Sequence, residues 1–169
     1  WDPRTRKQVG ACNVASADVE ITSLAFDDAS GLKIVAGTSE GSCSVFDLRS
    51  SKPLAVKEHQ YGLPIISTKF AGQRIISADS KVVKVWNASD ASPFTTIEAS
   101  VPVNDVCVAR SKDGKSSGLL MMACEQERLM SFYVPQLGRA PSWAMFLDNI
   151  TEELEETTKD EIYEDYKFV

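Results

Sequence analysis

The stretch "GTSEG", residues 37–41, has the G-x-S-x-G spacing of the strand-to-helix elbow that presents a nucleophilic serine in many hydrolases. Such a serine needs a histidine to accept its proton. The chain contains a single histidine, His59, which follows Ser39 by only twenty positions without a helical pattern between them. Elbow enzymes usually carry this histidine far downstream, so the spacing argues against hydrolase chemistry at Ser39.

The residues on either side of this stretch predict a hairpin turn instead of an elbow. Apolar and small polar side chains alternate in "SCSVFDLR", which follows it, and a period of two is typical of a strand. The preceding "LKIVAG" is short, apolar and β-branched, as expected for the partner strand. We therefore expect Ser39 to be a turn residue, with Gly41 supplying the backbone freedom of the turn.

This hairpin belongs to a repeat of about forty residues. Three first-strand segments align: "ITSLAFD", "IISTKFA" and "VNDVCVA". A second strand follows each of them, and then a third strand that ends in an aromatic residue. These aromatic residues are Phe46, Trp86 and Tyr133. A fourth strand candidate comes after each one, "SWAMFLDN" in the third repeat. The sequence therefore predicts three four-stranded units.

Such units resemble WD40 repeats, the blades of a β-propeller, in which a Trp-Asp pair closes the third strand. Trp1-Asp2 keeps the pair, and Phe46-Asp47 and Trp86-Asn87 are near matches. The expected fold class is all-β: a partial WD40 propeller of about three blades plus the last strand of a preceding blade. The expected boundaries are 17–60, 61–100 and 101–147 for the repeats, followed by an acidic, partly helical extension over 148–169. Three blades cannot close a ring, so we expect further blades upstream.

The WD40 pattern also suggests a role for His59. The Gly-His pair that precedes the first strand of a WD40 blade is represented by Glu58-His59. The resemblance implies that His59 belongs to the hydrogen-bond network of a blade and is neither a ligand nor a base. The turn aspartate of the pattern corresponds to Glu40 in the first repeat, and the second repeat shows no equivalent.

Composition points to an ordinary soluble protein without a metal or cofactor site. The chain has 169 residues, of which 43% are hydrophobic, enough for a sizeable core. Its four cysteines show no C-x-x-C spacing, which suggests a reducing compartment. No apolar run reaches the eighteen residues of a membrane span, and we expect neither a membrane span nor secretion. No catalytic residue, metal, cofactor, membrane or small-molecule substrate is expected.

Charge divides the chain into a neutral body and an acidic tail. Residues 148–169 contain nine acids and two lysines, whereas residues 1–147 contain fifteen acids and sixteen bases. Asp148 or Asn149 is suited to cap a short helix, with Glu152 and Glu153 in its first turn. Aromatic residues give the acidic tail anchors for a partner. The candidate partner-binding residues are Trp143, Phe146, Leu147, Ile150, Leu154, Tyr163, Tyr166 and Phe168.

Several runs of the sequence closely resemble the nucleolar protein ten family, also called essential nuclear protein two. These are "EHQYGLPI", "IISADSKVVKVWN", "VNDVC", "FLDNITEELEE" and "YEDYKFV". The resemblance implies a WD40 propeller in the nucleolus that acts as a structural assembly factor in the early precursor of the small ribosomal subunit. It implies other ribosome assembly factors as partners, and pre-rRNA as a further candidate. The candidate RNA contacts are the basic clusters Arg4, Arg6 and Lys7, and Arg110, Lys112 and Lys115.

A second function class remains open from the residues alone. "WDPR" and "FDLR" stand in consecutive repeats and resemble the paired boxes by which WD40 substrate receptors dock onto cullin ubiquitin ligases. The docking residues would be Arg4 and Arg49. An arginine two positions after the aspartate is also common in ordinary blades, where it pairs locally.

Overall fold

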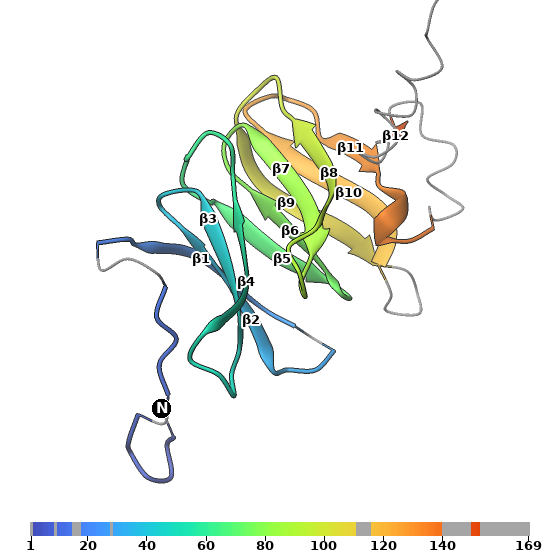
Figure 1. Cartoon of the computed structure of the whole chain (residues 1–169). Helices are drawn as coiled ribbons and strands as arrows, with labels where there is room; N and C mark the ends of the chain where they lie inside the picture. The colour runs from blue at the N-terminus through green and yellow to red at the C-terminus, as the bar shows by residue number, and fades with distance from the viewer. Residues whose placement is uncertain are drawn as a thin grey trace, which may run out of the picture.

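The structure, a computed structural model, describes residues 2–8, 10–14, 18–27, 29–110, 116–139 and 150–152. Within these residues the chain forms three four-stranded sheets that lie side by side in chain order (Figure 1). This arrangement confirms the all-β prediction. Among the described helices, none has the length and apolar character that crossing a membrane requires.

The first sheet begins after a small turn in which Asp2 bridges Lys7. It contains four antiparallel strands: β1 (Ile21–Phe26), β2 (Lys33–Thr38), β3 (Ser42–Asp47) and β4 (Pro53–Glu58). Val35, Val45 and Ala55 pair across three neighbouring strands. All three are buried, since the period of two directs them to the face that packs against the second sheet.

The second sheet repeats this antiparallel arrangement. Its strands are β5 (Ser67–Ala71), β6 (Arg74–Ala78), β7 (Val82–Asn87) and β8 (Pro93–Glu98). Both of its faces are covered. Ile75 and Trp86 pack toward the first sheet, whereas Ile76, Val83 and Val85 pack with residues of the third sheet. This sheet is therefore the best-buried part of the structure.

The third sheet has a different outer strand from the one that the repeat predicts. It consists of β9 (Val103–Arg110), β10 (Ser116–Cys124), β11 (Met130–Tyr133) and β12 (Ile150–Glu152), with the short 3-10 helix η1 (Pro135–Leu137) after β11. Strand β12 pairs with β11 in parallel, whereas β4 and β8 are antiparallel to their neighbours. The third sheet therefore extends beyond residue 147.

The prediction of a short helix capped by Asp148 or Asn149, with Glu152 in its first turn, is wrong at the residues that the structure describes, because Ile150–Glu152 form strand β12. Two reasons are apparent in the local sequence. Ile150 and Thr151 are β-branched and favour strand backbone, and the edge of β11 offers unpaired backbone groups. The remaining predictions for the tail fall on residues 148–149 and 153–169, outside the described residues.

The closing aromatic of the third repeat is also shifted by one position. Trp86 pairs with Ile75, and both face the preceding sheet. In the third sheet the corresponding pair that faces the preceding sheet is Phe132 with Leu120. Phe132, rather than Tyr133, is therefore the structural equivalent of Trp86. The sequence alone does not reveal this shift, because Phe132 and Tyr133 are adjacent aromatic residues.

Candidate functional site: a buried polar network in the second sheet

The residues with the chemistry of a catalytic site lie together between the first and second sheets. His59 Nδ1 is 2.7 Å from Asp79 Oδ2, and His59 Nε2 is 2.8 Å from the Ser77 hydroxyl oxygen. Ser77 also accepts a hydrogen bond of 3.0 Å from Trp86 Nε1. The loop after β4, the end of β6, the following turn and β7 each supply one member.

These contacts are satisfied by a neutral imidazole. With the proton on Nδ1, His59 donates to the Asp79 carboxylate, and its Nε2 accepts from the Ser77 hydroxyl. Burial lowers the pKa of His59 below its usual value, although the Asp79 carboxylate opposes this shift. Asp79 Oδ1 in turn accepts the backbone N–H groups of Lys81 and Val82 at 2.6 and 2.8 Å. Each polar atom of the histidine therefore has a partner.

The order serine, histidine, aspartate is that of a catalytic triad, but these three side chains are buried, unlike those of an accessible active site. His59 is 5% exposed, and Ser77 and Asp79 are fully buried. The Ser77 hydroxyl oxygen accepts the indole N–H of Trp86, and the side chain is closed to solvent in this structure. The network joins two strands and a loop, and its role is structural, as predicted for His59.

The prediction that the second repeat lacks the turn aspartate is wrong, because Asp79 fills that place. The pairing also changes the assignment in the first repeat. Gly37 pairs with Cys43 as Ala78 pairs with Val83, which makes Thr38, and not Glu40, the equivalent of Asp79. Thr38 Oγ1 accepts the Ser42 N–H at 3.1 Å and so closes the turn with a hydroxyl in place of a carboxylate.

Cys43 lies next to this network, within hydrogen-bonding reach of Ser77. It is fully buried, and burial raises the pKa of its thiol to about 12. The thiol therefore stays protonated and unreactive. Its burial could be predicted from its position two residues after Gly41. This position lies on the face of β3 that packs against the second sheet.

Ser39 lies in the turn between β2 and β3, as expected, and its hydroxyl accepts the Glu20 N–H at 3.2 Å. The structure explains why both ends of the motif, Gly37 and Gly41, are glycine. A Cβ on Gly37 would lie 2.5 Å from Ile65 Cγ2, and Gly41 has a φ of 79° and would meet the Leu63 carbonyl oxygen at 2.8 Å. The G-x-S-x-G spacing thus reflects close packing and a tight turn.

Replacing Ser39 by alanine is expected to leave function intact and to change the free energy of unfolding by no more than about 0.5 kcal/mol, because only one exposed hydrogen bond is lost. A fluorophosphonate probe should label neither Ser39 nor Ser77 in the full-length protein, with a known serine hydrolase in the same tube as the positive control. Specific labelling of either serine would contradict the structural role of the network.

Acidification is expected to destabilise the folded protein through His59. Because the folded pKa lies below the unfolded value of 6.5, the unfolded state binds the proton first. The contribution of neutral, buried His59 to the free energy of unfolding is therefore present above pH 6.5. As the pH falls below 6.5, the free energy of unfolding decreases by up to about 1.4 kcal/mol per pH unit. We expect the melting temperature of the wild type to fall more steeply than that of His59→Gln between about pH 7.5 and 5.5. Equal slopes would show that His59 does not remain neutral.

The arginines of the two "D-x-R" boxes pair with their own aspartates. Arg49 Nε and Nη2 donate to the Asp47 carboxylate at 2.8 and 2.6 Å, and Arg4 donates to Asp2 in the same way at 3.2 Å. This bidentate pairing holds the pKa of Asp47 well below its usual range. The side chains of Arg49 and Arg4 are 71% and 88% exposed. Local pairing on the surface is what ordinary blades show.

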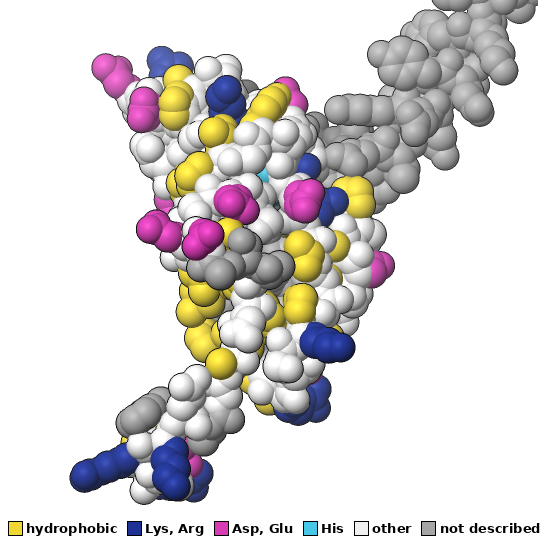
Figure 2. Space-filling view, turned by 60° about the vertical axis from the view of Figure 1, so that its left-hand side comes forward, with side chains coloured by type: hydrophobic (Ala, Val, Ile, Leu, Met, Phe, Trp, Pro, Cys, Tyr) yellow, Lys and Arg dark blue, Asp and Glu magenta, His cyan; other side chains and the backbone are white. Residues whose placement is uncertain are grey.

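The two basic clusters are not brought together among the described residues. Arg4, Arg6 and Lys7 lie in the small N-terminal turn, where basic side chains gather at the tip of the segment at the lower left of Figure 2. Arg110 ends β9 in the third sheet, on the far side of the second sheet. Lys112 and Lys115 lie outside the described residues.

Of the candidate tail residues, the structure describes only Ile150, in β12, which pairs with Ser131 of β11. Seven others lie outside the described residues: Trp143, Phe146, Leu147, Leu154, Tyr163, Tyr166 and Phe168. In the described part of the chain, no group of three or more His, Cys, Asp and Glu side chains is placed to hold a metal ion.

A cavity of about 990 Å³ opens along the inner strands β1, β5 and β9. Leu24, Phe26, Phe70 and Val108 supply much of its lining, and Lys69 and Arg110 are the cations that line it. Its walls come from the first strand of each sheet. The cavity thus runs along the first strands of the three sheets and reaches η1 at Leu137, and it contains none of the buried network.

Comparison with known proteins identifies the family. A family model described as "Nucleolar protein 10-like, N-terminal domain" matches residues 1–158. "Nucleolar protein 10" of Mus musculus is 47% identical over 179 residues, which cover 100% of this chain and 25% of that protein. "Ribosome biogenesis protein enp2 homolog" of Schizosaccharomyces pombe is 39% identical over 184 residues, 100% of this chain and 28% of that protein. The chain spans about a quarter of the length of these relatives.

The solved structures support the fold. A crystal structure of RRP9 WD40 repeats superposes with a TM-score of 0.60 at 15% sequence identity, covering 75% of this chain and 39% of that chain. The likeness confirms the WD40 propeller fold that the repeat predicts.

Proposed function

The chain belongs to the nucleolar protein 10-like family, and we propose that it forms part of a non-catalytic scaffold for assembly of the small ribosomal subunit precursor in the nucleolus. The observation that carries the proposal is the match of the family model to residues 1–158, supported by relatives named as nucleolar and ribosome biogenesis proteins. The proposed partners are other ribosome assembly factors and, through the basic clusters, pre-rRNA.

The geometry of the buried network fits a scaffold. The side chains that would form a triad are all engaged in holding β6, β7 and the loop after β4 together. Ser39 and the buried thiol of Cys43 are likewise explained by a turn and by packing. A rigid stack of sheets that presents exposed loops suits a protein whose task is to hold partners in place.

The proposed function is tested by purifying the tagged full-length protein from cells and sequencing the RNA that accompanies it. We expect precursor RNA of the small subunit, together with other assembly factors. Enrichment of large-subunit precursors alone, or of no pre-rRNA, would contradict the proposal. Recovery of ligase subunits that is lost on reversing Arg4 and Arg49 to Glu would favour the ubiquitin ligase hypothesis instead.

We expect the acidic tail to bind a basic partner through its aromatic side chains. Replacing Tyr163, Tyr166 and Phe168 by alanine in the full-length protein should reduce its entry into pre-ribosomal particles and leave its melting temperature unchanged, because the anchors are lost while the acids remain. The double variant Tyr163→Phe and Tyr166→Phe is the control, and it should enter normally because the rings are kept. Normal entry of the alanine variant would reduce the acidic tail, residues 148–169, to a linker.

A further inference from the structure

The connection between β4 and β5 exposes apolar side chains at one end of the sheets. Tyr61 is 48% exposed and Ile66 is 37% exposed, Pro64 is exposed, and Leu63 is half-buried. We call residues 60–66 the Tyr61 loop. Adjacent apolar side chains in solvent do not stabilise the fold, and on soluble proteins such groups mark interaction sites. Neither the buried network nor the packing of the sheets uses these side chains.

The loop is held firmly at both of its ends. His59, which precedes it, is buried in the polar network, and its N–H donates to the Gly41 carbonyl at 2.8 Å. Near the other end Ile65 is fully buried between the first and second sheets, and its N–H donates to the Thr38 carbonyl at 2.9 Å. The exposed side chains therefore project from a fixed backbone, so binding a partner would cost little ordering entropy.

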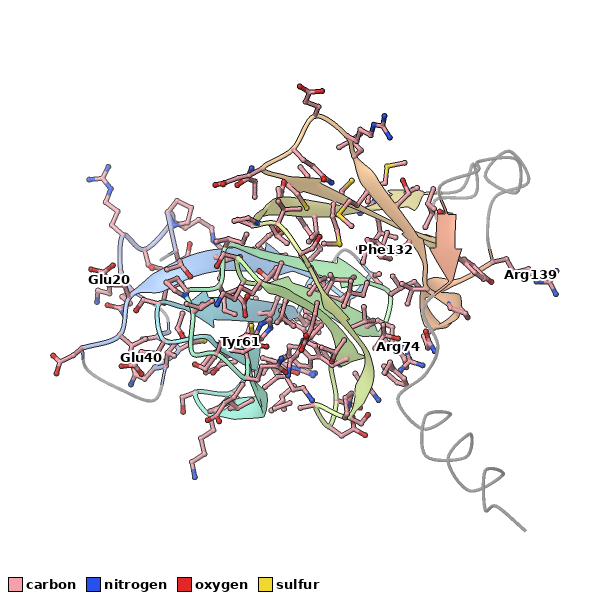
Figure 3. All side chains as sticks on the ribbon, turned by 90° about the horizontal axis from the view of Figure 1, so that it is seen from above. Glu20, Glu40, Tyr61, Arg74, Phe132 and Arg139 are labelled. Atoms are coloured by element: carbon pink, nitrogen blue, oxygen red, sulfur yellow. The ribbon has the colours of Figure 1, made fainter. Side chains whose placement is uncertain are left out.

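The negative charge around the Tyr61 loop favours a positively charged partner. The Gln60 side-chain amide donates to the Glu98 carboxylate at 2.8 Å, and the Gly62 backbone lies beside the Glu40 carbonyl. Figure 3 shows Glu20, Glu40 and Tyr61 toward one end of the sheets, whereas Arg74 and Arg139 lie toward the other. Exposed carboxylates at the Tyr61 end are Asp18, Glu20, Glu40, Glu58, Glu98, Glu125 and Glu127. The cations described at this end are Lys81 and Arg128 in loops and Lys84 of β7, whose ammonium donates to the Glu58 carbonyl, so carboxylates outnumber them.

The ring of Tyr61 itself already accepts a cation. The Lys81 ammonium lies 5.3 Å from the centre of the ring, a distance at which the face of an aromatic ring attracts positive charge. Because Lys81 already occupies this face of the ring, the attraction for a basic partner comes from the surrounding carboxylates. Phosphate groups would be repelled.

We propose that the Tyr61 loop is a docking surface for a lysine- and arginine-rich segment of a protein partner that also carries an apolar anchor. The anchor packs on Tyr61, Leu63 and Ile66, and the basic side chains face Glu40 and Glu98. This inference rests on the proposed scaffold function, because it names the chemistry of one partner of that scaffold.

The first step of the test identifies the molecules that contact the Tyr61 loop. A photo-crosslinking amino acid is placed at position 61 of the full-length protein in cells, and the crosslinked peptides are sequenced. The same amino acid at Gln73, an exposed position in the turn between β5 and β6 at the opposite end, is the control. We expect position 61, and not position 73, to crosslink to a protein segment rich in lysine and arginine. Crosslinks to RNA, to an acidic segment or to nothing above background would overturn the proposal.

The second step measures affinity with a synthetic peptide of the crosslinked sequence. The double variant Tyr61→Ala and Ile66→Ser, and separately Glu40→Lys with Glu98→Lys, should each weaken binding by about tenfold or more. Lys52→Glu, at the opposite end, should bind as the wild type does. Unchanged affinity in both double variants would overturn the docking surface.

Co-sedimentation with pre-ribosomal particles separates the two proposals. If the wild type sediments with the particles while position 61 gives no crosslink, the scaffold proposal stands and the docking surface is wrong. If the wild type does not sediment with them, the scaffold proposal itself fails.

Discussion

Replacing Trp86 by alanine is expected to lower the free energy of unfolding of the propeller by about 3–5 kcal/mol, the usual cost of removing a large buried aromatic side chain. Trp86 is fully buried and packs with Val35 and Val45 of the first sheet and with Ile65. Its removal leaves a cavity between two sheets and takes the N–H donor from Ser77. The melting temperature of the full-length protein and its folded yield would both fall.

Trp86→Phe is the matched control for this prediction. It keeps most of the buried ring and loses the indole N–H, so we expect a cost of about 1–2 kcal/mol, close to that of one buried hydrogen bond. An alanine variant that melts like the wild type would contradict the placement of Trp86 between the sheets.

Asp79→Ala is expected to have an effect of similar size, about 3–5 kcal/mol, for a different reason. The carboxylate accepts hydrogen bonds from His59 and from the backbone N–H groups of Lys81 and Val82. Removing it leaves these donors without their acceptor in a largely buried site, where each unmade bond costs about 1–3 kcal/mol. The turn between β6 and β7 would loosen together with the loop that His59 holds.

Asp90→Ala provides the comparison for Asp79. Asp90 is exposed, and like Asp79 it accepts the backbone N–H of a residue two positions on, Ser92, at 3.0 Å. Its loss should change stability by no more than about 0.5–1 kcal/mol. Combining Asp79→Ala with Trp86→Ala should cost less than the sum of the two, because both act through Ser77 and His59. Equal effects of Asp79→Ala and Asp90→Ala, or full additivity, would argue against a connected network.

The strands of the first two sheets could be predicted because short apolar, β-branched runs bounded by turn residues mark them, even though β2, β3 and β6 are buried on both faces. Val35, Val45 and Val85 sit where alternation places them. The role of His59 was also predictable, because a lone histidine before a repeat's first strand matches the WD40 pattern. The Trp-Asp pair at residues 1–2, its two near matches and the repeat length together led to the correct fold.

Other features depend on pairing between strands, which the sequence does not display. Thr38 and Asp79 occupy the same place in their turns, although one is a hydroxyl and the other a carboxylate. Strand β12 is separated from β11 by residues 134–149 and pairs with it in parallel. The antiparallel pattern of the repeat therefore does not predict this strand. The exposure of Tyr61 likewise follows from the anchoring of its loop at His59 and Ile65.

The most direct test of the scaffold account is the ratio of small to large ribosomal subunits in cells whose full-length protein is replaced by variants. Depletion should lower the small subunit selectively. Ser39→Ala should restore the ratio, whereas Asp79→Ala should fail to restore it, in proportion to its lost folded protein. An unchanged ratio on depletion, or failure of Ser39→Ala at the wild-type protein level, would contradict a non-catalytic scaffold for the small subunit.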